Sequence, residues 1–271
     1  MSIIVKTLNS WSEIQTYAKP GWVYRGQRSA AWDLSTSLER CCEREGIQPN
    51  DRHRLEDEFL RDFRRAYHQY SQHVPAKGSI IEWMSLMQHH GAPTRLLDFT
   101  YSIYVAAYFA LETADSDCAV WAVKAPWVLQ ESVAALGLAG KAFATKLQAP
   151  TREEHETVSN DVLFQPPFAR FTILLTPFRL NERLRTQRGT FLAPGDVSTS
   201  FMNNLLALPG HEDETHVIKL EIPSTLRKEA LQNLFLMNIS RTSLFPGLDG
   251  YAQSLGIFHP AYVPIDWGDS F

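Results

Sequence analysis

The segment QHHGAPTRLLDFTYSIYVAAYFALE, residues 88–112, carries the densest polar chemistry of the chain and joins two predicted helices. Gly91 and Pro93 are expected to end the first helix sharply, because glycine favours the C-terminal cap and proline cannot continue a helix. The residues that follow are predicted to form a short rigid loop, where positioned functional side chains commonly lie. Thr100 or Ser102 can cap the second helix, whose apolar residues recur at helical spacing.

Other helices are predicted on either side of this segment. Over residues 50–70, apolar residues recur every three or four positions, which indicates an amphipathic helix. Residues 79–90 are predicted to be helical as well, and Ser79 stands at the start of a sequence with the spacing of a capping box. Further helices are expected to begin near Leu38 and at Ser224.

Strands are predicted from enrichment in β-branched and aromatic residues. They fall at residues 22–25, 118–124, 171–176, 189–193 and 216–222. Helices and strands do not alternate regularly, and no glycine-rich dinucleotide fingerprint is present. We therefore expect an α+β domain with a mainly antiparallel sheet flanked by helices. It is predicted as a single domain over residues 1–271, with a core from about 22 to 256 and a polar loop near 148–167; residues 239–256 are interpreted as a structural latch.

Composition excludes several classes of protein. The chain has 271 residues and a formal net charge of −4, which gives no global electrostatic signature for nucleic acid. Its longest apolar run, residues 103–111, is too short to span a bilayer, and no secretory leader is recognised. The cysteines lack a C-x-x-C spacing, so reduced thiols of a cytoplasmic protein are expected. His89 and His90 are adjacent instead of four apart, and no metal site is predicted.

The segment WVYRGQRSAAWDLSTSLER, residues 22–40, ends an apolar strand in Arg25. The fork of donors on an arginine suits a phosphate or carboxylate, and Gly26 would let the backbone approach a ligand closely. A buried ion pair with Asp33 or Asp98 is the structural alternative.

The polar residues of segments 88–100 and 181–193 have structural interpretations too. His89 suits a helix C-terminus, Arg95 and Asp98 can pair with each other, and Thr100 can be a cap. In NERLRTQRGTFLA, residues 181–193, the polar side chains can simply face solvent. Together, however, the three segments can supply the convergent polar groups that a pocket needs.

These motifs resemble the FRG domain family, which is named for its (F/Y)RG motif. The resemblance extends from about residue 22 to 256, and the long second block is specific. His90 departs from the family pattern, which more often has an aromatic residue there. The matching segments are Tyr24-Arg25-Gly26, residues 88–100, Tyr108-Phe109-Ala110, residues 181–191 and residues 244–250.

A more distant resemblance is to mono-ADP-ribosyltransferases. It places Arg25 at that family's first position, Asp98-Phe99-Thr100 at its second, and Gln187, Asn181 or Glu182 at its third. The resemblance implies that Arg25 binds the diphosphate or ribose of NAD, that Thr100 holds the catalytic strand, and that Tyr24 or Tyr108 stacks on nicotinamide. A glutamine at the third position can orient a substrate but lacks the full charge of a carboxylate.

The expected function is thus an NAD-dependent ADP-ribosyltransferase-like enzyme, of toxin or phage-defence type, with NAD as its substrate. A macromolecular acceptor, protein or nucleic acid, and a neutralising or regulatory partner protein are its expected partners. The alternatives are a non-catalytic ligand-sensing or interaction module, and a hydrolase of nucleotides or nucleic acid with His89 as general base. Predicted catalytic residues are Arg25, His89, Asp98, Thr100 and Gln187, and predicted cofactor contacts are Tyr24, Arg25, Gly26, Arg95 and Tyr108.

Overall fold

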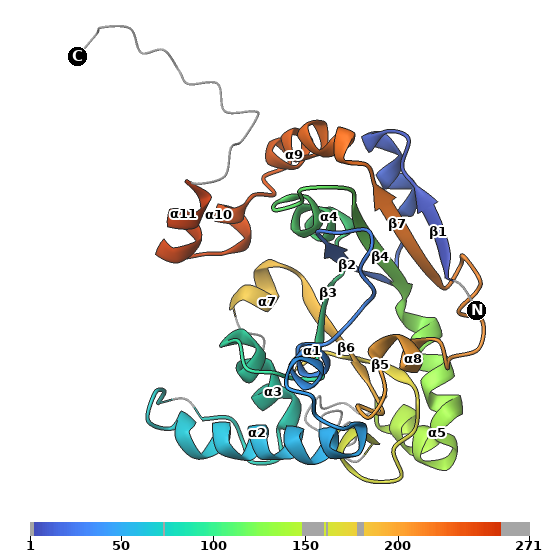
Figure 1. Ribbon diagram of the computed structural model, residues 1–271, viewed down its shortest axis with the longest axis vertical. Coiled ribbons are helices and arrows are strands. Elements are labelled where there is room, and N and C mark those ends of the chain that lie inside the picture. The colour runs from blue at the N-terminus through green and yellow to red at the C-terminus, as the bar shows by residue number, and fades with distance from the viewer. Residues whose placement is uncertain (1–2, 73, 148–159, 161, 178–181, 256–271) are drawn as a thin grey trace, which may run out of the picture.

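The computed structural model describes residues 3–72, 74–147, 160, 162–177 and 182–255, and its centre is a twisted sheet (Figure 1). Among these residues the sheet has seven strands in the order β1-β7-β4-β2-β3-β6-β5. Only β1 and β7 pair in parallel, and the other neighbouring pairs are antiparallel, as predicted. The strands are β1 Ile4–Thr7, β2 Trp22–Gln27, β3 Leu97–Thr100, β4 Cys118–Lys124, β5 Thr172–Leu175, β6 Gly189–Pro194 and β7 Val217–Ile222.

Helices cover both ends of the sheet. In Figure 1, α4 and α9 lie beside β4 and β7, whereas α1, α2 and α3 lie near β3, β6 and β5. The helices are α1 Ser37–Arg44, α2 Arg52–Tyr67, α3 Ile80–His89, α4 Ile103–Leu111, α5 Ala125–Leu147, α7 Glu182–Thr186, α8 Phe201–Leu205, α9 Arg227–Leu236, α10 Arg241–Leu244 and α11 Leu248–Ser254. Short 3-10 helices are η1 Trp11–Tyr17, η2 Pro49–Asp51 and η3 Ser224–Leu226.

Two hydrophobic cores lie against the sheet, and β2 contributes to both. Because side chains alternate along a strand, Tyr24 belongs to the core under α4 and α9, and Val23 belongs to the core with α3 and α5. Arg25 is two residues after Val23 on the strand, so its side chain lies on the same face as Val23 and on the opposite face of the sheet from Tyr24.

The pairing between β2 and β3 is short. Tyr24 and Thr100 are the registered partners, whereas β2 pairs with β4 along its whole length. The sheet therefore opens beside Arg25, and side chains of β2 and β3 can line a pocket there.

The structure corrects several local expectations. Residues 97–100, predicted as loop, form β3, because they pair with β6 from Leu97 to Thr100. Ser102, and not Thr100, caps α4, by accepting a hydrogen bond from the Val105 amide. Ser79 precedes α3 without any side-chain cap hydrogen bond. Most of the predicted loop at 148–167 lies outside the described residues.

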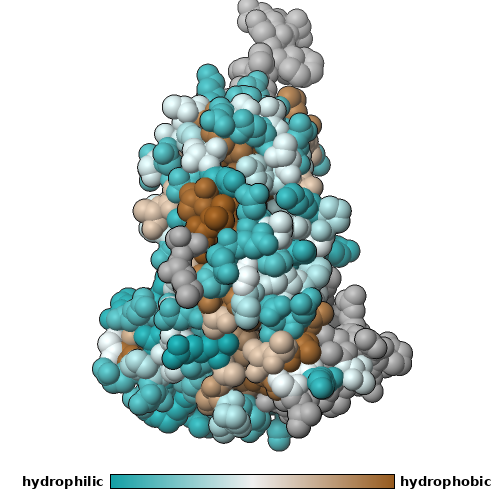
Figure 2. Space-filling view, turned by 90° about the vertical axis from the view of Figure 1, so that its right-hand side faces the viewer, coloured by the Kyte–Doolittle hydropathy of each residue, from teal (hydrophilic) through white to brown (hydrophobic). Residues whose placement is uncertain are grey.

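Figure 2 shows a face that is mostly hydrophilic, with hydrophobic side chains in separate patches. Such scattered exposure is ordinary for a folded chain. The helices of the described residues include none with the length and apolar character needed to cross a membrane. In the same part of the chain, no cluster of three histidine, cysteine or acidic side chains is placed to hold a metal ion. Cys41, Cys42 and Cys118 are free thiols.

Candidate functional site

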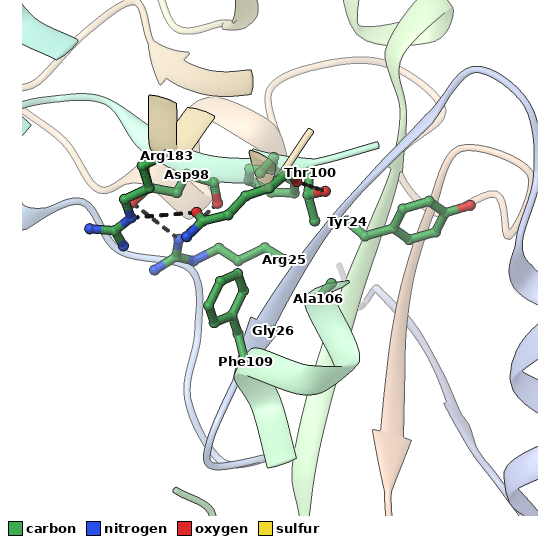
Figure 3. Close-up of a pocket in the computed structure, with 10 residues that line it drawn as sticks. Tyr24, Arg25, Gly26, Asp98, Thr100, Ala106, Phe109 and Arg183 are labelled. Atoms are coloured by element: carbon green, nitrogen blue, oxygen red, sulfur yellow. Dashed lines mark hydrogen bonds and ion pairs between the residues drawn. The ribbon is translucent and has the colours of Figure 1, made fainter. Parts of the chain in front are cut away.

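A pocket of about 210 Å³ lies where β2 and β3 diverge (Figure 3). Its polar lining comes from Arg25 on β2, Asp98 and Thr100 on β3, and Arg183 and Gln187 from α7 and the turn before β6. Phe109 of α4 lies across from them. The three segments that the sequence singled out therefore meet at one cavity.

Arg25 is the most deeply placed charge of the pocket, with its side chain only 22% exposed. Its Nη1 donates to the backbone carbonyl of Asp98 at 2.8 Å and lies 3.9 Å from the Asp98 carboxylate. Burial lowers the pKa of Arg25, and the Asp98 charge partly opposes this effect. Its buried Nε has no hydrogen-bond partner among the described residues. Arg25 thus forms the ion pair considered above, and its Nε is a donor that no described residue uses.

Gly26 is required by the packing of α4. A β-carbon at this position would stand 1.9 Å from the carbonyl oxygen of Ala106 and 2.6 Å from the amide nitrogen of Ala110. Real side chains do not approach backbone that closely, so helix α4 can lie against β2 only if residue 26 is glycine. The sequence predicts that Gly26 lets the backbone approach a ligand closely. In the structure, Gly26 instead lets helix α4 approach strand β2 closely.

Thr100 and Gln187 connect β3 to the turn before β6. The Thr100 hydroxyl donates to the Gln187 carbonyl at 2.7 Å and accepts from the Ser102 amide at 3.1 Å. The Gln187 side chain accepts from Nε of Arg183 at 3.4 Å and donates to the carbonyl of Leu244 at 3.1 Å. Both ends of the Gln187 amide therefore have partners, which fixes its orientation at the pocket wall.

The C-terminal segment, defined here as residues 240–254, lies against the same wall. The ring of Phe245 packs edge-on to Phe109 at 5.8 Å, and the guanidinium groups of Arg183 and Arg241 lie 5.0 and 4.7 Å from its centroid. Arg241 also forms an ion pair at 2.7 Å with the buried Glu112, which caps the C-terminus of α4. The predicted latch is therefore part of the site's support.

His89 lines a second, smaller hollow of about 80 Å³, whose walls include Asp98, Arg183 and Gln187. Partial burial lowers the pKa of His89, and the charges of His90 and Arg183 lower it further. The imidazole is therefore neutral near pH 7 and able to accept a proton. Arg25 and His89 line adjoining hollows that share four lining residues, Asp98, Phe99, Arg183 and Gln187.

Three predicted cofactor contacts are not brought into the cavity. The Tyr24 backbone borders the pocket, but its ring points away (Figure 3), and its hydroxyl bonds to the Tyr17 carbonyl and the Lys19 amide, both at 2.8 Å. Tyr108 is buried, and its hydroxyl donates to Glu112 at 2.9 Å. Arg95 is 1% exposed and paired with Glu56, so it supports the core.

Glu182 and Asn181 are the other two residues that the resemblance to ADP-ribosyltransferases offers for its third position. Glu182 is exposed at the start of α7 and lines neither hollow. Asn181 lies outside the described residues. Of the two candidates that the structure describes, Gln187 is the one that lines the pocket.

Sequence reasoning missed several surrounding residues. Phe109 lines the pocket, whereas the sequence predicts Tyr24 or Tyr108 as its aromatic contact. The place of Phe109 beside Tyr108 in the Tyr-Phe-Ala triplet is the available signal. A larger groove of about 760 Å³ also adjoins the pocket, with Arg25, Gly26 and Phe109 common to both. Trp32, in the loop after β2, lines this groove and is 46% exposed.

Comparison with protein families finds one similarity, in the N-terminal part of the chain. Residues 20–118 match the model described as the FRG domain. This match agrees with the resemblance that the Tyr24-Arg25-Gly26 motif indicates, and it includes β2, β3 and α4 around the pocket. The similar motifs at 181–191 and 244–250 lie beyond the matched residues. No curated protein and no solved structure gives a significant match.

Proposed function

We propose that the pocket binds NAD and that the protein transfers ADP-ribose from it to a macromolecular acceptor. In this reaction the bond between C1′ of the ribose and the nicotinamide nitrogen breaks, and its electron pair leaves with nicotinamide. A nucleophile of the acceptor forms the new bond to C1′ and loses its proton to a base or to water. The proposal includes an ADP-ribosyltransferase-like class for the fold.

One observation carries this proposal: an arginine that is only 22% exposed, with an unpaired Nε, faces the carboxylate of Asp98 across diverging strands. A desolvated guanidinium is suited to the diphosphate of a dinucleotide, because charge-assisted hydrogen bonds strengthen where water is excluded. The cationic ribose that develops as nicotinamide departs is stabilised by a nearby negative charge. Arg25 and Asp98 provide one group for each task.

The sequence left the third position open between Gln187, Asn181 and Glu182, and Gln187, which lines the pocket, has no charge. In the structure Asp98 is the carboxylate among the described residues that line the pocket, and its side chain is 60% exposed and accessible to a ligand. Gln187 then acts as a positioning residue, since its amide holds Arg183 and the C-terminal segment. Phe109 provides an aromatic surface for the nicotinamide ring.

The dimensions of the cavity agree with a ligand that extends beyond it. Drug-sized ligands occupy pockets of roughly 300–1,000 Å³. The pocket of about 210 Å³ is smaller than this range, but the adjoining groove of about 760 Å³ shares Arg25 with it. A dinucleotide whose diphosphate contacts Arg25 can therefore place one half in each.

The direct test is nicotinamide release from NAD by the purified protein. We expect release by the wild type and a fall of about 100-fold or more in Arg25→Ala, because removal of a preorganised charged donor costs that much in comparable sites. Arg54→Ala is the matched control, because Arg54 lies on α2 with Asp51 and Glu58 as partners, outside the pocket. Absence of release from the wild type contradicts the proposal, and release undiminished in Arg25→Ala contradicts the assigned site.

Asp98 is tested by the near-isosteric change Asp98→Asn. The proposal predicts a lower kcat with a smaller change in KM, because the lost charge acts mainly in the transition state. An unchanged kcat would remove Asp98 from the mechanism.

The acceptor is identified by transfer from labelled NAD in a cell extract. Label that is removed by protease indicates a protein acceptor, and label removed by nuclease indicates nucleic acid. Toxin or phage-defence action, with a neutralising partner, is the biological role that we attach to this activity. A non-catalytic sensing module is indicated instead if NAD binds without release of nicotinamide or transfer of label.

A second candidate function, hydrolysis of a nucleotide or nucleic acid, is favoured by the place of His89. Its neutral imidazole shares a hollow with Asp98, an arrangement suited to a general base. Under this reading His89→Gln abolishes hydrolysis, and the wild-type rate falls at acidic pH as His89 becomes protonated. Under the transferase reading, His89→Gln retains nicotinamide release.

A further inference from the structure

The large groove beside Arg25 differs from the pocket in its lining. The loop from residue 28 to 36, between β2 and α1, forms one wall, and α1 contributes Arg40 and Glu43. Trp32 of this loop is 46% exposed although it is a large aromatic residue. The guanidinium of Arg28 lies 5.0 Å from the centroid of its ring. The guanidinium lies over the indole ring, and a nucleobase can stack on the exposed part of this cation–π pair.

Hydrogen bonds hold the loop that carries this surface. The Gln27 side chain accepts from the indole nitrogen of Trp121 at 2.9 Å and donates to the carbonyl of Asp33 at 3.0 Å. The Ala30 amide donates to the carbonyl of Asp117 at 2.8 Å. Trp32 lies between these anchors, so little conformational freedom is lost when a ligand binds.

The charges of the groove indicate the size of the ligand. Its lining contains the arginines Arg25, Arg28 and Arg40 and the carboxylates Asp33, Glu39 and Glu43. A surface for a nucleic-acid strand needs a clear excess of positive charge along its length, because each phosphate is an anion. A balanced lining instead suits a single nucleoside, whose ribose hydroxyls can donate to carboxylates.

We infer that the groove binds the adenosine half of the dinucleotide, with the base stacked on Trp32 and Arg28 and the diphosphate on Arg25. This inference rests on the proposed function for the identity of the ligand. It adds a binding subsite and names Trp32 as the residue that contacts the base.

The test compares two probes in calorimetric titrations: ADP-ribose, which contains adenosine, and nicotinamide mononucleotide, which lacks it. Trp32→Ala is expected to weaken ADP-ribose binding by about tenfold or more, as loss of base stacking does elsewhere, and to leave binding of nicotinamide mononucleotide unchanged. Trp32→Phe retains most of the affinity because it keeps an aromatic face. Tyr70→Ala, at an aromatic residue that is 82% exposed and outside the groove, is the matched control.

Four results would overturn the inference. The first is that the wild type does not bind ADP-ribose at millimolar concentration. The second is that Trp32→Ala binds ADP-ribose as tightly as the wild type does, and the third is that Trp32→Ala weakens the binding of both probes equally. In the fourth, Trp32→Ala loses binding of a single-stranded oligonucleotide while ADP-ribose binding is intact, which assigns the surface to nucleic acid. If nicotinamide release is absent but ADP-ribose binding depends on Trp32, the transferase proposal fails and the subsite stands.

Discussion

Gly26 and Ala106 touch so closely that a β-carbon on residue 26 would stand 1.9 Å from the carbonyl oxygen of Ala106. This contact fixes the distance between β2 and α4, and therefore between Arg25 and Phe109 on the walls of the pocket.

Gly26→Ala is expected to destabilise the fold by about 3 kcal/mol, at the upper end of the cost of overpacking, because the obstructing atoms are backbone and cannot rotate away. A chain of this size then loses roughly 6–12 °C in Tm, measured by differential scanning calorimetry. Gly78→Ala is the control, since a β-carbon at position 78 meets nothing within 4 Å. Equal melting temperatures for Gly26→Ala and wild type would contradict the packing.

The buried ion pair between Arg95 and Glu56 is a second determinant of stability, with both side chains 1% exposed. Arg95→Met leaves a buried carboxylate without its partner and is expected to cost about 3–5 kcal/mol in urea unfolding. The double variant Arg95→Met/Glu56→Leu should be more stable than Arg95→Met, because no charge remains buried. Glu58→Gln, which breaks the exposed pair with Arg54, is the control and is expected to change the free energy of unfolding far less, because solvent screens the exposed charges.

Thr100 tests the link between β3 and Gln187. Thr100→Val keeps the shape but removes the hydroxyl that donates to Gln187, and it leaves a buried carbonyl unsatisfied at a cost of about 1–3 kcal/mol. Thermal unfolding measures this loss. Thr16→Val, at an exposed hydroxyl that donates to the Glu13 carbonyl, should change Tm little. If the two variants melt alike, the Thr100 hydrogen bond contributes nothing specific.

His53 predicts how stability depends on pH. Burial is the main cause that lowers its pKa, and its hydrogen bond to Asp196 at 3.1 Å partly opposes the shift. The unfolded chain therefore takes up a proton at His53 at higher pH than the folded chain does. This linkage reduces the free energy of unfolding as pH falls below about 6.5, with a slope of at most about 1.4 kcal/mol per pH unit until the folded state is protonated too.

The variant His53→Gln should flatten that slope, as measured by urea unfolding between pH 7.5 and 5. The exposed Gln69, just after α2, provides the control variant Gln69→Ala, which removes no titratable group and should keep the wild-type slope. A steeper slope in His53→Gln would reverse the sign of the assigned shift.

Local spacing was enough to predict the amphipathic helices. The apolar period over 50–70 corresponds to α2, and the segment from Ser79 corresponds to α3. Helix α5 was missed because it is apolar on many faces and is interrupted at Gly137, where the backbone is not helical. Strand β3 is only four residues long and follows a proline-containing turn, so its own sequence gives little signal. Its pairing with β6 is a tertiary effect.

The site, too, has features that the sequence predicts and features that depend on tertiary packing. Convergence of Arg25, Asp98 and Gln187 could be predicted because family resemblance carries tertiary information. The two-residue period of β2 could have shown that Tyr24 and Arg25 face opposite sides. The partnership of Arg95 with Glu56 could not be read from spacing, since it depends on how α2 packs against the turn before β3.

Because Leu244 and Phe245 support the pocket, the parts of the pocket are synthesised at different times. Arg25 is synthesised early and Phe245 close to the end of the described chain, and at typical rates of about 5–20 residues per second their synthesis is separated by roughly 10–45 seconds. A nascent chain on the ribosome therefore presents the Arg25 wall long before the wall that Phe245 supports. The complete cavity exists only after translation has passed residue 245, so unfinished chains lack a finished site.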